Sequence, residues 1–285
     1  MKRLFGGIDL TWKKLIIFAV LAGLYTGVMA ILPITKNTSF RDITVTFECW
    51  IFFGTLIILN SKSPLDSALK CFVFFLISQP LVYLVQVPFY RDGWAIFGFY
   101  RNWILWTILT FPMGYIGWYL KKNKWWGLLI LTPVMLFLGL FYEQYLAELL
   151  TFFPQHLLTV LFCLFVFVSC GLYVFEDPKL KKIQLAFIAL IIFGMTFWAV
   201  THKASYHTSI LPEGISLKGD ETVTFTDERF GPLELQYNES LEEYLIDVDF
   251  HKLGKTELTI ETPAGETYVY ELDVSRNSYE ITRKQ

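Results

Sequence analysis

The stretch IQLAFIALIIFGMTFWAV, residues 183–200, decides the fold class because it runs for eighteen residues without a charge. A helix of that length crosses a hydrocarbon core about 30 Å thick. Lys179, Lys181 and Lys182 stand just before it, and the sequence after it becomes polar and acidic. The stretch therefore predicts a membrane-spanning helix at the junction of an apolar region and a different C-terminal domain.

Six similar apolar runs precede this one, and they predict further spans at residues 15–34, 43–60, 68–88, 102–120, 125–146 and 155–175. Hydrophobic residues make up 54% of the 285-residue chain and charged residues only 18%, whereas soluble domains contain about 25% charged residues. We therefore expect residues 1–203 to form a multi-pass, all-α bundle of about seven transmembrane helices in the cell membrane.

Residues 204–285 have the alternating pattern of β-strands with one buried face. Tyr244, Ile246, Val248 and Phe250 give the clearest alternation. The Gly and Pro residues of Leu253-Gly254-Lys255 and Pro263-Ala264-Gly265 predict hairpin turns. We expect about six short antiparallel strands in a small sandwich or barrel, with strands around residues 223–225, 233–237, 244–250, 258–260 and 268–274.

The segment GKTELTIETPAGETYVYELDV, residues 254–274, resembles the last hairpin of bacterial immunoglobulin-like modules. It has a Gly before one strand and a tight turn before the next. The resemblance covers about 20 residues and implies a β-sandwich, without implying a ligand. It does not extend to residues 1–200, for which we recognise no characterised family.

Lysine and arginine predict how the chain is threaded, because positive flanks are retained on the cytoplasmic side of a membrane. Twelve of them flank one side of the predicted spans and four flank the other; Lys36, Arg41, Arg91 and Arg101 are the four. The N-terminus is therefore expected in the cytoplasm and the β-domain outside it. An alternative is that residues up to Ala30 form a cleaved signal peptide, but the apolar run continues past that point.

The two parts differ in charge. Residues 1–200 hold 16 Lys/Arg and 9 Asp/Glu, a net charge of +7, and residues 201–285 hold 8 and 17, a net charge of −9. Neither part has the dense basic patch of a nucleic-acid-binding protein. We therefore exclude nucleic acid as a partner and expect the lipid bilayer, with a small solute or an extracytoplasmic protein as further partners.

Glu48 is the most notable polar residue, because it falls inside a predicted span, where an acidic side chain is costly unless it is paired or faces water. Arg91, Arg101 or His156 are possible partners. Two interpretations stay open, a structural ion pair and a polar binding pocket. The candidate binding residues, all expected toward the extracytoplasmic side, are Glu48, Gln79, Gln86, Arg91, Asp92, Arg101, Glu143 and His156.

The sequence has no P-loop, H-E-x-x-H, G-x-S-x-G or G-x-G-x-x-G motif. Cys49, Cys71, Cys163 and Cys170 all fall in apolar runs, without the spacing of metal ligands. Asp247 and Asp249 could oppose Glu271 and Asp273 on paired strands and hold a cation, although a solvated acidic face is the simpler interpretation. We therefore assign no catalytic residue, metal or cofactor, and leave open whether the protein is an enzyme.

Two functions fit these features. The first is small-solute transport, or the membrane component of a transporter, with Glu48, Gln79 and Gln86 lining a cavity beside Pro80 and Pro88. The second is a non-catalytic envelope sensor or assembly scaffold that binds an extracytoplasmic partner through its β-domain.

Overall fold

The chain divides into two compact units. The helical unit contains residues 1–146 and 154–197, and the second unit, which contains all the strands, comprises residues 147–153 and 198–285. The structure is a computed structural model that describes residues 4–36, 38–91, 93–201, 206–212, 214–238, 243–276 and 278–284.

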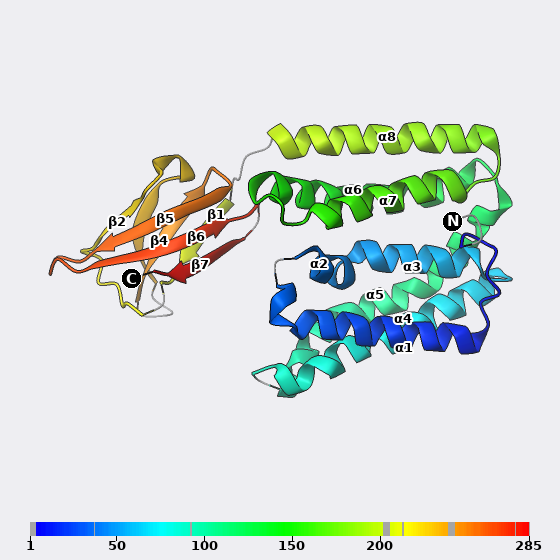
Figure 1. The fold of residues 1–285 in the computed structure, drawn as a ribbon, viewed down its shortest axis with the longest axis horizontal. Helices are drawn as coiled ribbons and strands as arrows, with labels where there is room; N and C mark the ends of the chain where they lie inside the picture. The colour runs from blue at the N-terminus through cyan, green and yellow to red at the C-terminus, as the bar shows by residue number, and fades with distance from the viewer. Residues whose placement is uncertain are drawn as a thin grey trace. The chain divides into compact units, whose positions relative to one another are not determined.

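Each predicted span coincides with a helix. Figure 1 shows α1 and α3 to α8 side by side, with consecutive helices running in opposite directions. The helices are α1 (Trp12–Ile31), α2 (Ser39–Val45), α3 (Phe47–Leu59), α4 (Pro64–Gln86), α5 (Phe97–Gly117), α6 (Trp126–Thr151), α7 (Leu157–Tyr173) and α8 (Pro178–Thr201). Short 3-10 turns join some of them: η1 (Pro33–Thr35), η2 (Val87–Phe89), η3 (Gly93–Ile96) and η4 (Trp118–Lys122).

Among the described residues, four helices are long and apolar enough to cross a membrane: α1, α4 with η2, α6 and α8. A fifth span is possible if α2 and α3, which meet at a 50° bend, count as one. Helix α7 is apolar but has only 17 residues. A membrane location is therefore supported by four or five helices, and seven crossings remain a prediction.

The helical unit exposes apolar side chains and buries polar ones. On α8, Leu190 is 66% exposed and Phe193 is 72% exposed, whereas Glu48 on α3 is fully buried and Gln79 on α4 is 3% exposed. Soluble proteins seldom bury an acidic side chain without an ionic partner. In a lipid bilayer, by contrast, apolar side chains face the lipid and polar ones face the interior of the bundle. The pattern fits helices that face lipid.

Glycines let neighbouring helices approach closely. A Cβ atom at Gly23 would lie 2.6 Å from the Ser78 carbonyl oxygen, and one at Gly27 would lie 2.8 Å from the Val85 Cβ. The two glycines form a G-x-x-x-G pair on α1, the spacing that brings membrane helices into backbone contact. Helix α1 therefore packs tightly on α4.

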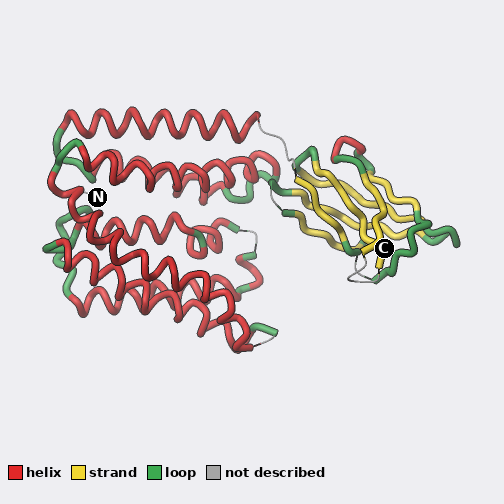
Figure 2. The backbone as a smooth tube through the Cα atoms, turned by 180° about the vertical axis from the view of Figure 1, so that it is seen from behind, coloured by secondary structure: helices red, strands yellow, loops and turns green. Residues whose placement is uncertain are grey.

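The β-domain contains two antiparallel sheets. One has the order β1-β4-β3 and the other β2-β5-β6-β7; Figure 2 shows the strands from behind. The strands are β1 (Tyr206–Ile210), β2 (Thr222–Phe225), β3 (Leu233–Asn238), β4 (Glu243–Phe250), β5 (Gly254–Glu261), β6 (Thr267–Val274) and β7 (Tyr279–Arg283), with the 3-10 turn η5 (Glu228–Phe230) between β2 and β3.

One apolar core joins the two sheets, and the alternating residues of the sequence build it. Ile246 and Phe250 of β4 and Leu258 and Leu272 of β5 and β6 are all fully buried in it. The domain therefore contains two packed sheets, as a sandwich requires. The resemblance to immunoglobulin-like modules stays a prediction.

Two details of the β-domain differ from the prediction. The described residues contain seven strands, and two of these, β1 and β7, were not predicted. Pro263-Ala264-Gly265 does lie in the hairpin between β5 and β6. Leu253-Gly254-Lys255 instead lies where the chain crosses from β4 in one sheet to β5 in the other, so the prediction of a hairpin there was wrong.

Candidate functional site

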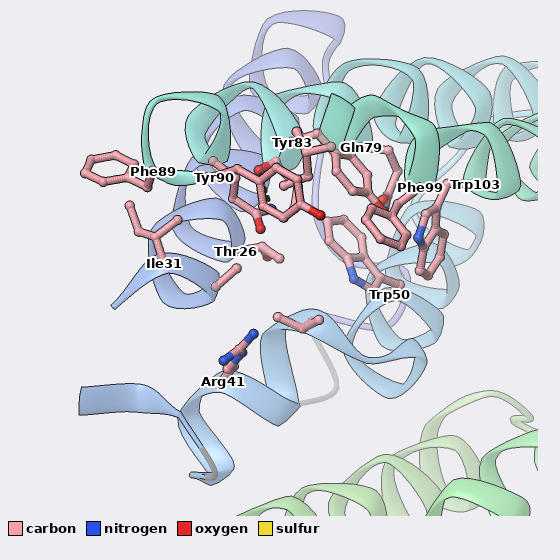
Figure 3. A pocket seen from close by; sticks show the side chains of 15 residues that line it. Thr26, Ile31, Arg41, Trp50, Gln79, Tyr83, Phe89, Tyr90, Phe99 and Trp103 are labelled. Carbon is pink, nitrogen blue, oxygen red and sulfur yellow. Dashed lines mark hydrogen bonds between the residues drawn. The ribbon is translucent and has the colours of Figure 1, made fainter. Parts of the chain in front are cut away.

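A cavity of about 650 Å³ lies among α1, α2, α3, α4 and α5. Small-molecule pockets range from about 300 to 1,000 Å³. Arg41 of α2 lines it together with Gln79 and Gln86 of α4. Figure 3 shows Arg41 reaching into the space below Thr26 and Tyr90, with Gln79 on the far side among Tyr83, Phe99 and Trp103. We call this space the Arg41 cavity.

The polar groups of the Arg41 cavity have unused hydrogen-bonding capacity. Within the part of the chain that the structure describes, no hydrogen bond or ion pair engages the Arg41 guanidinium. The Gln79 amide nitrogen is buried and has no partner among these residues. A buried amide donor without a partner costs about 1–3 kcal/mol, so a bound ligand with acceptor oxygens would relieve that cost.

Helix α2 is fixed on two sides, and this fixes Arg41. On one side the Thr26 hydroxyl of α1 donates to the Thr44 carbonyl at 3.2 Å. On the other side Asp42 Oδ2 lies 2.6 Å from His156 Nδ1 and accepts from the Thr159 hydroxyl at 3.1 Å. Asp42 therefore faces α7, and its neighbour Arg41 faces the cavity.

A second cavity, of about 330 Å³, lies among α3, α4, α5 and α6. Its walls are almost entirely apolar, and we call it the apolar cavity. Trp50 and Trp103 line both cavities, so the two spaces share these side chains as a common border. Its other lining residues include Phe47, Gly54, Ile58, Phe75, Trp106, Met113 and Phe137.

Glu48 lies in neither cavity lining. It is fully buried, and its Oε1 atom accepts a long contact of 3.7 Å from the Cys163 thiol of α7. Its Oε2 atom has no hydrogen-bond partner among the described residues. Neither Arg91 nor Arg101 pairs with it, and His156 pairs with Asp42 instead, so the predicted ion pairs of Glu48 are not present among the described residues.

The structure therefore separates the eight predicted site residues. Gln79 and Gln86 come together at the Arg41 cavity, and His156 lies with Asp42 on the α7 side of α2. Glu143 is buried on α6, and Arg91 and Arg101 are exposed outside both linings. Asp92 lies outside the described residues.

Sequence reasoning counted Arg41 among the flanking charges but did not place it in a site, and it gave Asp42 no role. Both residues lie just before the predicted span at residues 43–60, where charges are ordinary. The signal that could have found them is a pair of opposite charges at positions 41 and 42, directly before a run that contains Glu48.

The expected cation site of the β-domain is not formed. Asp247 and Asp249 lie on β4, and Glu271 and Asp273 lie on β6 of the other sheet, so these strands do not pair. Ser209 donates to Asp247 at 2.5 Å and His207 Nδ1 lies 3.0 Å from Asp249. Lys255 lies 3.3 Å from Glu271 and 3.1 Å from Asp273, so these carboxylates belong to cross-strand pairs.

Asp227 is the most strongly held carboxylate of the β-domain. The Arg229 guanidinium and the Lys252 ammonium both donate to it, at 2.8 and 2.7 Å, and hold the pKa of Asp227 well below its ordinary value. Glu271 is similar: Lys284 and Lys255 lower its pKa. Both groups are partly exposed, and their ion pairs tie strand ends and turns together at neutral pH.

Within the described residues, no three His, Cys, Asp or Glu side chains are grouped as metal ligands. Comparisons with known protein families, with curated proteins and with solved structures give no match for this chain. Any function must therefore be argued from the cavities and the charges themselves.

Proposed function

We propose that the helical unit crosses the membrane seven times and binds a small anionic or polar solute in the Arg41 cavity, as a small-solute carrier or the membrane component of a transporter. The observation that carries the proposal is an arginine and a buried amide that face one cavity inside an apolar bundle and that no described residue pairs with. Arginine is the side chain best suited to bind carboxylate or phosphate oxygens.

The proposed orientation places the Arg41 cavity on the extracytoplasmic side. The cavity lies at the end where α1 and α4 finish and α5 begins. Lys62 lies between α3 and α4, Lys121 lies in η4 and Lys179 lies in the first turn of α8, and these elements meet at the opposite end of the bundle. Because positive charge is retained in the cytoplasm, the lysine-rich end is assigned to that compartment.

Butyl phosphate is a suitable probe for this proposal, because it is small, anionic and water-soluble. We expect it to bind the purified full-length protein and to change the tryptophan fluorescence, since Trp50 and Trp103 line the cavity. Arg41→Gln should weaken binding about tenfold or more, since hydrogen bonds to charged groups contribute roughly 1.5–3 kcal/mol. Arg101→Gln, which removes an exposed arginine outside both linings, is the matched control.

Uptake of labelled butyl phosphate into proteoliposomes separates a carrier from a protein that only binds. Equal binding by wild type and Arg41→Gln would refute the proposed site. Binding without uptake would instead favour a sensor.

The β-domain favours a second candidate function, a sensor or assembly scaffold with an extracytoplasmic protein partner. The domain has its own apolar core and holds most of the acidic residues of the chain, and a solute carrier has no evident need of such a domain. Deleting residues 206–285 should abolish partner binding and leave butyl phosphate binding intact if this second function is correct.

A further inference from the structure

The Arg41 cavity and the apolar cavity follow one another along the bundle and share Trp50 and Trp103 at their border. On α4, Gln86, Tyr83 and Gln79 line the Arg41 cavity, and Phe75 and Cys71, further along the helix, line the apolar cavity. From the end of η3 along α5 the order is Ile96 and Phe99, then Trp103, then Trp106 to Gly114. The same order on two antiparallel helices shows that the cavities follow one another along the bundle axis.

Helix α2 and most of α3 follow the same order. Arg41 and Val45 line the polar cavity, Trp50 borders both, and Gly54 and Ile58 line the apolar one, although Phe47, before Trp50, also reaches the apolar cavity. The lining of the apolar cavity on α3 extends from Phe47 to Ile58. At 1.5 Å per residue this is about 16 Å, roughly half of a hydrocarbon core of about 30 Å.

We infer that the two cavities bind one anionic amphiphile, whose phosphate or carboxylate headgroup lies at Arg41 and whose hydrocarbon chain passes Trp50 and Trp103 into the apolar cavity. This inference rests on the proposed function and adds the class of ligand. A polar solute alone would leave the apolar cavity unfilled, and an uncharged hydrocarbon would leave the Arg41 guanidinium and the Gln79 amide without partners.

The two tryptophans at the border suit such a ligand. Each has an apolar ring and one polar N–H group, so tryptophan is favoured where an apolar region meets a polar one. The length of the apolar cavity matches a chain confined to one leaflet. The ligand could be a membrane phospholipid, of which one chain enters, or a free single-chain acid or phosphate, and both share the chemistry of an anionic head and one chain.

The test uses the purified full-length protein in a neutral detergent with dodecyl phosphate as the probe. We expect one dodecyl phosphate per protein to remain bound in native mass spectrometry, and inorganic phosphate to bind at least tenfold more weakly. Dodecanol, which lacks the charge, should not be retained. Adding phosphatidic acid should displace dodecyl phosphate if a membrane phospholipid is the ligand, and should fail to do so if only a single-chain amphiphile fits.

A substitution at Gly54 should block the site of the ligand's hydrocarbon chain and leave the headgroup site open. Gly54 lines the apolar cavity, and a Cβ atom there would meet no other atom within 4 Å, so Gly54→Leu should fill space without displacing a neighbour. We expect Gly54→Leu to weaken dodecyl phosphate binding at least tenfold and to leave butyl phosphate binding unchanged. Gly194→Leu on α8, which also meets no atom within 4 Å and lines neither cavity, is the matched control.

The outcomes separate this inference from the proposed function. If Gly54→Leu binds dodecyl phosphate as well as wild type while Arg41→Gln loses butyl phosphate, the amphiphile inference is refuted and the solute site stands. If Arg41→Gln binds both probes normally, both proposals fail.

A wild-type measurement covers the case in which Gly54→Leu does not fold. Dodecyl phosphate with a photoreactive diazirine at the chain end should label peptides that contain Ile58 or Met113, at the inner end of the apolar cavity. Labelling confined to the exposed surface of α8 would refute the inference.

Discussion

Asp42 shows why a charged residue at the start of a span can be structural. Its carboxylate joins α2 to α7 through His156 and Thr159. His156 has a left-handed backbone, with φ of 62°, directly before α7 begins. A non-glycine residue in this conformation costs about 1–3 kcal/mol, so the side-chain contact to Asp42 offsets part of a local strain.

We predict that Asp42→Asn and His156→Gln each destabilise the helical unit by about 1–3 kcal/mol, because each leaves a mostly buried polar partner behind. The double variant should cost less than the sum of the two, since both remove the same contact. Thermal unfolding of the protein in detergent, followed by circular dichroism, gives the three values. Strict additivity would show that the contact contributes nothing.

Asp227 makes the stability of the β-domain depend on pH in the acidic range. Its folded-state pKa is lowered by Arg229 and Lys252 from the ordinary 3.8, so its contribution to stability is complete above about pH 3.8 and is lost as the pH falls further. We predict that Asp227→Asn speeds pepsin cleavage within residues 206–284 at pH 5, and that the difference from wild type shrinks at pH 3. Glu234→Gln, on β3, is the control. A difference that is constant with pH would contradict the assignment.

The helices were well predicted, because an apolar run of about 20 residues with at most one charge is typical of a membrane span. The break between α2 and α3 at Thr46 was not predicted, because its direct neighbours, Val45 and Phe47, are apolar and give no sign of a helix end. In the β-domain, β4 and β6 were found from their alternation, whereas β1 and β7, with five residues each and few apolar side chains, were missed.

The G-x-x-x-G pair of α1 was present in the sequence but was not used, and it gives a test of helix packing. We predict that Gly27→Leu forces α1 away from α4 and lowers the melting temperature of the full-length protein in detergent, because its Cβ atom would lie 2.8 Å from Val85. Gly194→Leu adds the same side chain where nothing lies within 4 Å and should leave the melting temperature nearly unchanged. Equal effects of the two substitutions would mean that this close approach is unimportant.

The division of the chain into an apolar helical part and an acidic β-rich part could be predicted from composition alone, but the candidate site could not. Gln79 and Gln86, which were among the candidate residues, are seven residues apart and both line the Arg41 cavity from α4, because residues at that spacing lie on one face of a helix. Their meeting with Arg41, and the exclusion of Glu48 from the cavity, depend on how α1 to α5 pack. That packing is set by contacts between residues distant in sequence, such as Thr26 with Thr44 and Asp42 with His156.

The threading of the whole chain determines which compartment the Arg41 cavity and the β-domain face, and it makes the last prediction. Seven crossings with the lysine-rich connections in the cytoplasm place Gln285 outside it. A reporter that fluoresces only in the cytosol should therefore be dark when fused after Gln285 and bright when fused after Asn123, between Lys122 and Lys124. If the fusion after Gln285 is also bright, the number of crossings is even, and the cavity and the β-domain cannot both be extracytoplasmic. If the two signals are reversed, the lysines have not set the orientation, and the solute would be taken from the cytoplasm instead.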